Sequence, residues 1–112
     1  MVFVIEHSRI INVLNSILPV EIIALTVGPI IMFNGKSDYV TLNHESIHCQ
    51  QYMETFYIGF LIIYLYDYIK NRLSGMNPIE AYENTRAEKE SYMYENDTEY
   101  LTYRKRFLWL FN

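Results

Sequence analysis

The 112-residue chain contains one cysteine, three prolines and four glycines. A single cysteine excludes an intramolecular disulfide framework, so Cys49 cannot help to cross-link a small secreted scaffold. The scarcity of proline and glycine, together with a hydrophobic content of 51%, excludes a disordered or collagen-like chain and favours a compact, helix-rich protein. At this length we expect one domain that spans residues 1–112.

Positive charge and long apolar runs are also scarce. Nine Lys and Arg against thirteen Asp and Glu give a formal net charge of −4, so binding to nucleic acid is not expected. The most apolar stretches, 10–33 and 55–66, fall short of the ~18 uninterrupted apolar residues of a membrane-spanning helix. The first residues, MVFVIEHSRIINVL, lack a basic segment before an apolar one and predict no secretory signal. A cytoplasmic or membrane-peripheral location is favoured.

The N-terminal third of the chain predicts one helix followed by a small strand element. Residues 8–18 have apolar side chains at helical spacing, and Pro19 is expected to end that helix. Residues 21–33 are rich in β-branched side chains and are interrupted by Gly28-Pro29, which predicts one or two short strands. Because proline cannot donate to a sheet ladder, we expect Pro29 at an edge or a bulge. The polar segment 34–39 indicates a turn.

The remaining two thirds predict helices, which makes the fold mainly α within the α+β class. Residues 42–73 form a long apolar-rich helical stretch, and the SG dipeptide after it is typical of a helix end. The sequence NPIE has the residues of a helix start and predicts a helix over 77–95. The sequence NDTE repeats this signal and predicts a last helix over 96–111.

A metal-binding motif, H-E-x-x-H, lies within the long helical stretch at residues 44–48. Residues four apart on a helix are about 40° apart around the axis and about 6 Å apart along it, so His44 and His48 can face one ion. Glu45 lies one position round, where it can accept a proton from a metal-bound water. The motif predicts a Zn²⁺ site with two histidine ligands and Glu45 as catalytic base. The alternative is a helix whose two histidines bind nothing.

The third ligand is expected to be a carboxylate, because a catalytic zinc normally has three protein ligands and histidine is nearly exhausted. His7, the one other histidine, has no helical context to position it. The helix that follows offers five candidates: Glu80, Glu83, Glu88, Glu90 and Glu95. Glu88, in the middle of that helix, is our first choice, and Glu90 is the second. The alternative is an exposed acidic face paired with Arg86 and Lys89.

Glu88 can reach the motif only if the long helical stretch is interrupted. A straight helix over 42–73 would be about 48 Å long, and a tight antiparallel return would leave Glu88 about 20 Å from His48 along the axis. We therefore expect a break or a sharp bend within 56–62, with Gly59 as the break or as a close-packing point.

The motif followed by a glutamate on a later helix resembles the gluzincin pattern. The segment AEKESY is similar to the E-x-x-A-D/Y segment that carries the third ligand in membrane-associated gluzincin peptidases. Residues 22–110 also resemble small single-domain H-E-x-x-H proteins of similar length. The resemblance implies zinc, a minimal zincin-like helical domain and peptidase-like activity on a peptide or protein substrate. Ser91 and Tyr92 stand where those peptidases have Ala and Asp, so an acidic partner for a ligand is missing there.

Side chains beside the motif suggest further roles. Gln51 either bonds a substrate or a metal ligand, or is a core amide. Cys49 points about 100° away from the motif and is expected to be a small buried apolar residue. Hydrolysis also needs a group that stabilises the developing negative charge. Tyr92, Tyr94 and Arg86 are the candidates for this stabilising group, because they are close in sequence to the expected third ligand.

Two further segments have a possible role in binding. A strand edge within 23–33 would suit a substrate backbone, as in β-augmentation. The C-terminal segment YRKRFLWLFN combines basic and aromatic residues. We favour a final helix that packs on the core, and the alternatives are an anchor on anionic lipid or a cover over the cleft.

These observations support three hypotheses of function. The first is a zinc-dependent metallohydrolase, peptidase-like, with His44, His48 and Glu88 as ligands and Glu45 as general base. The second is a zinc-stabilised binding or scaffold protein without catalysis, since a domain this small gains from a metal staple. The third is a peripheral membrane protein in which the motif is incidental. The sequence does not specify an oligomeric state.

Overall fold

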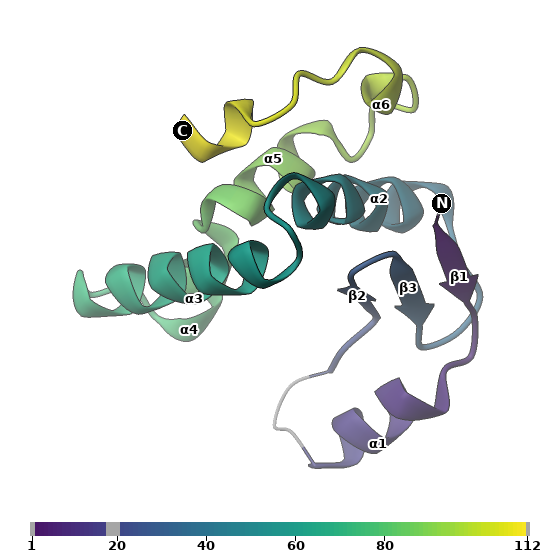
Figure 1. The fold of residues 1–112 in the computed structure, drawn as a ribbon. Coiled ribbons are helices and arrows are strands. Elements are labelled where there is room, and N and C mark those ends of the chain that lie inside the picture. The colour runs from purple at the N-terminus through teal and green to yellow at the C-terminus, as the bar shows by residue number, and fades with distance from the viewer. Residues whose placement is uncertain (1, 18–20, 112) are drawn as a thin grey trace.

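The computed structural model describes residues 2–17 and 21–111, and Pro19 lies outside them. Within these residues the fold is mainly α, as predicted, with six α-helices and one small sheet (Figure 1). The elements are β1 (Phe3–Ile5), α1 (Arg9–Ile17), β2 (Ala24–Val27), β3 (Ile30–Phe33), α2 (Tyr39–Glu54), α3 (Ile58–Leu73), α4 (Pro78–Glu83), α5 (Arg86–Tyr94), α6 (Tyr100–Tyr103) and the 3-10 helix η1 (Leu108–Phe111). No helix of the described chain is long and apolar enough to cross a membrane.

The sheet has the strand order β1-β3-β2, with β1 parallel and β2 antiparallel to the central strand. Strand β1 was not predicted, because its three residues are too few for a period to show. Gly28 and Pro29 form the two-residue connection between β2 and β3, and Gly28 has a φ of 60°. A positive φ at the first central position is what such tight hairpins require, so glycine is needed there. Pro29 thus lies in a turn, and the expectation of an edge or a bulge is wrong.

The predicted interruption of the long helical stretch lies between α2 and α3. Helix α2 ends at Glu54 and α3 begins at Ile58, so the break covers 55–57, at the N-terminal limit of the predicted window. Two non-glycine residues turn the chain, Phe56 with a φ of 55° and Tyr57 with a φ of 65°. Gly59 is a close-packing point, because a Cβ there would lie 3.0 Å from the Thr55 Cβ.

The stretch predicted as one helix over 77–95 is two helices, α4 and α5. The capping box at Asn77 is present, as its sequence predicted. The predicted helix is divided at Thr85. The side chain of Thr85 accepts a hydrogen bond from the Glu88 backbone N–H and so caps a separate helix, α5. Thr85 and Glu88 have the T-x-x-E spacing of a second helix start. The predicted last helix is also wrong, since α6 ends at Tyr103 and Arg104 has extended backbone.

Helix α2 lies at the centre of the molecule, between the sheet on one side and α5 with the C-terminal segment on the other (Figure 1). Asp38 caps it through the Thr41 backbone N–H, so α2 begins at residue 39, within the segment predicted as a turn. Each side of α2 has its own apolar cluster. Cys49 packs with the sheet, buried as predicted, and Tyr52 packs with Phe60 and Trp109.

Candidate metal centre

The three motif residues lie in the middle of α2, and all are buried. The relative exposure is 8% for His44, 8% for Glu45 and 4% for His48. Because α2 is continuous from its cap at Asp38, both imidazoles lie on one side of the helix, with ring centroids 5.0 Å apart. One ligand atom from each of the three residues lies within 4.8 Å of the others, which is a spacing that suits one metal ion.

Glu88 of α5 lies directly opposite the two imidazoles, with a relative exposure of 3%. Its Oε1 is 2.9 Å from His44 Nε2, and its Oε2 is 3.0 Å from His48 Nε2. The break at 55–57 and the separate start of α5 at Thr85 together bring α5 against α2. The structure therefore brings together the four residues that the sequence analysis singled out, and we call them the His–Glu cluster: His44, Glu45, His48 and Glu88.

Strong electrostatic coupling joins Glu88 to His48. Burial raises the pKa of Glu88, but the charges and hydrogen bonds of the two histidines outweigh it, so the net pKa is well below the usual range. Burial lowers the pKa of His48, but the Glu88 carboxylate outweighs it and raises the pKa to about 9. In the metal-free chain a buried carboxylate is thus balanced by a protonated imidazole. A bound cation would take the place of that positive charge and release the proton.

Glu45 differs from Glu88 because one of its carboxylate oxygens has no partner. Its Oε2 is buried and makes no hydrogen bond to any residue that the structure describes. Burial is the largest influence on its pKa, which is raised despite the nearby histidines. An unpaired buried carboxylate oxygen costs free energy of folding, so its presence in the cluster indicates a function other than stability.

A polar chain leads from His48 away from the cluster to the C-terminal segment. The Gln51 Oε1 lies 2.8 Å from His48 Nδ1 and accepts a hydrogen bond from it, so Nε2, which faces Glu88, is the nitrogen that could bind a cation once its proton is released. The Gln51 amide in turn donates to Glu90 Oε1 at 2.8 Å, and Glu90 is bonded by Arg104. Both sequence interpretations of Gln51 describe the structure, because this amide is fully buried in the core and also bonds a candidate ligand. Glu90, the second choice for third ligand, faces Arg104 and not the imidazoles.

The remaining candidates lie at different distances from the cluster. The Glu95 Oε2 is 3.6 Å from His44 Nδ1, and the Tyr92 ring centroid is 4.6 Å from that of His44. Arg86 is bonded to Asp67, so it is not placed to stabilise an oxyanion. The following three residues lie elsewhere: Tyr94 stacks on Tyr100, Glu80 closes the capping box of α4, and His7 bonds Gly35 through its backbone.

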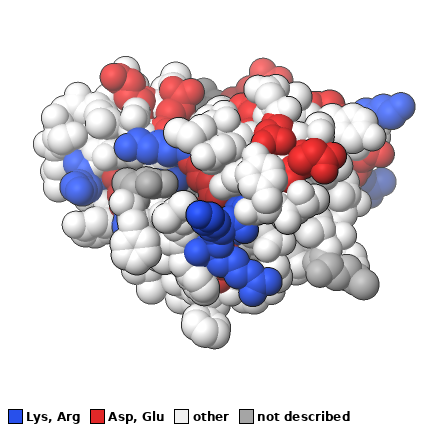
Figure 2. Space-filling model, turned by 90° about the horizontal axis from the view of Figure 1, so that it is seen from above, with Lys and Arg blue, Asp and Glu red and all other residues white. Residues whose placement is uncertain are grey.

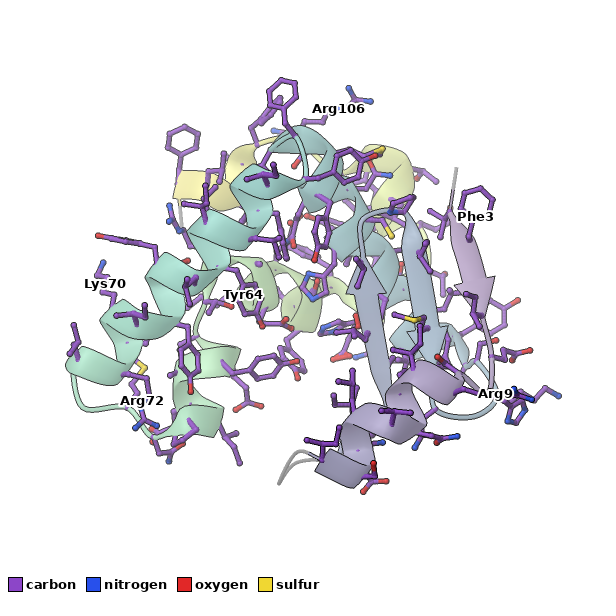
Figure 3. All side chains as sticks on the ribbon, turned by 60° about the horizontal axis from the view of Figure 1, so that its bottom comes forward. Phe3, Arg9, Tyr64, Lys70, Arg72 and Arg106 are labelled. Carbon is purple, nitrogen blue, oxygen red and sulfur yellow. The ribbon has the colours of Figure 1, made fainter. Side chains whose placement is uncertain are left out.

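Tyr64 of α3 is a residue of the site that sequence analysis missed. It points inward from α3 towards α5 (Figure 3), and its hydroxyl donates to Glu88 Oε2 at 2.9 Å. Burial and the Glu88 charge both raise the pKa of Tyr64, so the hydroxyl keeps its proton as a donor. Because the chain has eleven tyrosines, no pattern in the sequence distinguished this one.

Comparison of the chain with protein-family models, with curated proteins and with solved structures finds no match. The interpretation of the His–Glu cluster therefore depends on its own geometry and chemistry.

Proposed function

We propose that the protein is a zinc-dependent metallohydrolase, peptidase-like, in which His44, His48 and Glu88 bind Zn²⁺. One observation carries the proposal: the Nε2 atoms of two buried histidines lie 2.9 and 3.0 Å from the two oxygens of a single buried carboxylate. Two imidazoles and one carboxylate are the ligand set of a catalytic zinc site that keeps a fourth position for water. The hydrogen bonds of Gln51 and Tyr64 to these ligands support the same assignment, since metal ligands are usually oriented in this way.

Glu45 is the general base in this proposal. Zinc, when bound, would lower the pKa of a coordinated water to about 7 and polarise a substrate carbonyl. The unpartnered Oε2 of Glu45 is available to accept the proton of that water, and it returns the proton to the leaving amine. Because burial raises its pKa, the carboxyl is a stronger base than an exposed glutamate and holds the proton between the two steps.

Strand β2 is an edge strand of the sheet and packs against α2 beside the motif. Thr26 directs its backbone groups away from β3, but its carbonyl accepts a hydrogen bond from the Tyr52 hydroxyl at 3.2 Å, and its relative exposure is only 7%. The Thr26 hydroxyl donates to the Glu45 carbonyl at 3.4 Å, which places this edge beside the motif. The Tyr52 hydroxyl thus occupies the carbonyl that an added peptide strand would need, and the proposal of a peptide substrate depends on the ligand set and the base, not on this edge. Tyr92, next to His44, is the remaining candidate for stabilising the oxyanion.

A second candidate function is a zinc staple without catalysis. The burial of the cluster favours it, since the most exposed of the four residues has a relative exposure of only 8%. In that case zinc would connect α2 to α5 and stabilise a small domain by its binding free energy. The two functions differ in what Glu45 does: the hydrolase needs its carboxylate, whereas the staple does not.

The test combines metal content with hydrolysis. We expect about one zinc per chain by mass spectrometry in protein purified without added metal, and its loss in His48→Ala and Glu88→Ala. Glu83→Ala is the matched control, because Glu83 is an exposed glutamate outside the cluster. Glu45→Gln should keep the zinc but no longer cleave a pooled peptide library that the unaltered protein cleaves.

Three outcomes would contradict parts of this proposal. Zinc retained by Glu88→Ala would assign the third ligand elsewhere. Cleavage by Glu45→Gln at the unaltered rate would refute the role of the base. Bound zinc with no cleavage by the unaltered protein would favour the staple.

A further inference from the structure

One side of α3 exposes a continuous apolar surface. Opposite it, Phe60 and Asp67 are buried against the rest of the protein. The exposed side chains recur at helical spacing, with relative exposures from 48% to 84%, and we call them the α3 face: Ile58, Leu61, Ile62, Leu65, Tyr66, Ile69 and Leu73. A surface helix normally carries polar residues on its outer side, and one that is apolar on both sides is covered on both sides.

The size of the α3 face sets it apart from scattered exposed side chains. Its seven large apolar residues, each about half exposed or more, lie in one row along a single helix, whereas exposed apolar side chains of a monomer are normally scattered singly. The helix η1 lies beside α3, since Trp109 and Leu110 pack with Phe60 and Ile63. Phe111 of η1 is 83% exposed.

Exposed basic side chains flank the α3 face, although the chain as a whole is acidic. Lys70 and Arg72 project from the C-terminal end of α3, and Arg106 lies beyond the other end (Figure 3). None of the three forms an ion pair with the residues that the structure describes. The one acidic residue of α3, Asp67, is buried and paired with Arg86. Figure 2 shows most of the visible acidic side chains in the upper half of the view, with some carboxylates next to the central basic cluster.

A polar hollow adjoins the α3 face near its C-terminal end. It encloses about 320 Å³ and is lined by Lys70, Arg86 and Lys89, with Asp67 as its single acidic residue. Tyr66 and Lys70 belong to α3 and border the hollow, so apolar surface and excess positive charge are continuous. An apolar surface next to positive charge is suited to bind a molecule that has an apolar part and an anionic part.

We propose that the α3 face binds the surface of a membrane that contains anionic lipid, with α3 parallel to the bilayer plane. The apolar side chains would enter the acyl boundary, while Lys70, Arg72 and Arg106 contact lipid phosphates. A second copy of the chain fits less well, because its own α3 would bring the same basic residues; α3 itself has no exposed carboxylate, and Glu80 and Glu83 belong to the adjacent α4.

Vesicle sedimentation tests this proposal. The protein should bind vesicles of phosphatidylcholine mixed with phosphatidylserine, and bind more weakly as salt is added. Ile62→Gln with Leu65→Gln should weaken binding by about tenfold or more, because two apolar side chains leave the bilayer. The matched control is Ile79→Gln with Met93→Gln, two side chains that are 68% and 71% exposed on other helices. It should bind as the unaltered protein does.

The charge contribution is tested separately by Lys70→Glu with Arg72→Glu. This variant should lose about tenfold in affinity for the mixed vesicles, with little change on phosphatidylcholine alone. Equal binding by the Ile62/Leu65 variant and the unaltered protein, or no binding to mixed vesicles, would overturn the proposal. Self-association without lipid that the same variant abolishes, measured by sedimentation velocity, would assign the face to a second copy instead. Circular dichroism confirms that the variants remain folded.

Discussion

Arg104→Met should strongly destabilise the protein, because it leaves two buried carboxylates without their shared cation. Arg104 donates to both oxygens of Glu54, at 2.7 and 3.0 Å, and to both oxygens of Glu90, at 2.7 and 2.9 Å. The side-chain exposures are 3%, 4% and 5% for Arg104, Glu54 and Glu90. Removing one partner of a buried ion pair costs about 3–5 kcal/mol, since the remaining charge stays desolvated.

This loss is large for a domain of this size. Unfolding free energies of single domains are about 5–15 kcal/mol, so Arg104→Met should lower the midpoint of thermal unfolding by roughly 10–20 °C. Urea unfolding gives the free energy directly, with circular dichroism as the global probe. Fluorescence of Trp109 serves as a local probe, because its indole donates to Glu54 at 2.8 Å. Lys105→Met is the control, since Lys105 is exposed and next in the chain.

The pH dependence provides a second check on the same reasoning. Burial raises the pKa of Glu90, but the hydrogen bonds from Arg104 outweigh it and hold the pKa below the usual value. A depressed pKa contributes stability above the unfolded-state pKa, and that contribution disappears as the pH falls through the folded-state pKa. In Arg104→Met burial is opposed only by the hydrogen bonds from Tyr100 and Gln51, so the pKa of Glu90 should rise and protonation should restore stability as the pH falls from neutral. The destabilisation should therefore be smaller at pH 5 than at pH 7.5. A loss under about 1 kcal/mol, or an equal loss at both pH values, would refute this account.

Two further predictions concern the His–Glu cluster. Gln51→Leu removes the acceptor of His48 Nδ1 and should weaken zinc binding about 10–100-fold in a chelator competition, whereas Gln50→Leu, a change on the other side of α2, should not. Equal affinity in both variants would show that the amide does not orient the ligand. In metal-free protein, burial lowers the pKa of His48, but Glu88 outweighs it and raises the pKa to about 9, above the value of about 6.5 usual for histidine. The contribution of protonated His48 to the free energy of unfolding should be complete below about pH 6.5 and lost as the pH rises through about 9. Urea unfolding in the presence of a chelator measures it. A flat profile over this range, or the same slope in His48→Gln, would contradict the pairing.

The sequence by itself determined the features that depend on neighbours within a turn or two of helix. The cap at Asn77 and the positions of His44 and His48 on one side of α2 follow from local spacing. The restriction of the third ligand to a carboxylate followed from the shortage of histidine. The second helix start at Thr85 was equally local, and the T-x-x-E spacing would have revealed it.

Only the tertiary structure decided the features that depend on residues far apart in the chain. Strand β1 exists because it pairs with β3, and its three residues carry no period of their own. Arg104 leaves the helical conformation where its side chain reaches Glu54, fifty positions earlier, and no local signal announces that contact. Tyr64 became part of the site because α3 packs against α5. Local spacing fixes which side of a helix a residue occupies, whereas the partner opposite it is fixed by packing between elements, which depends on the whole chain at once.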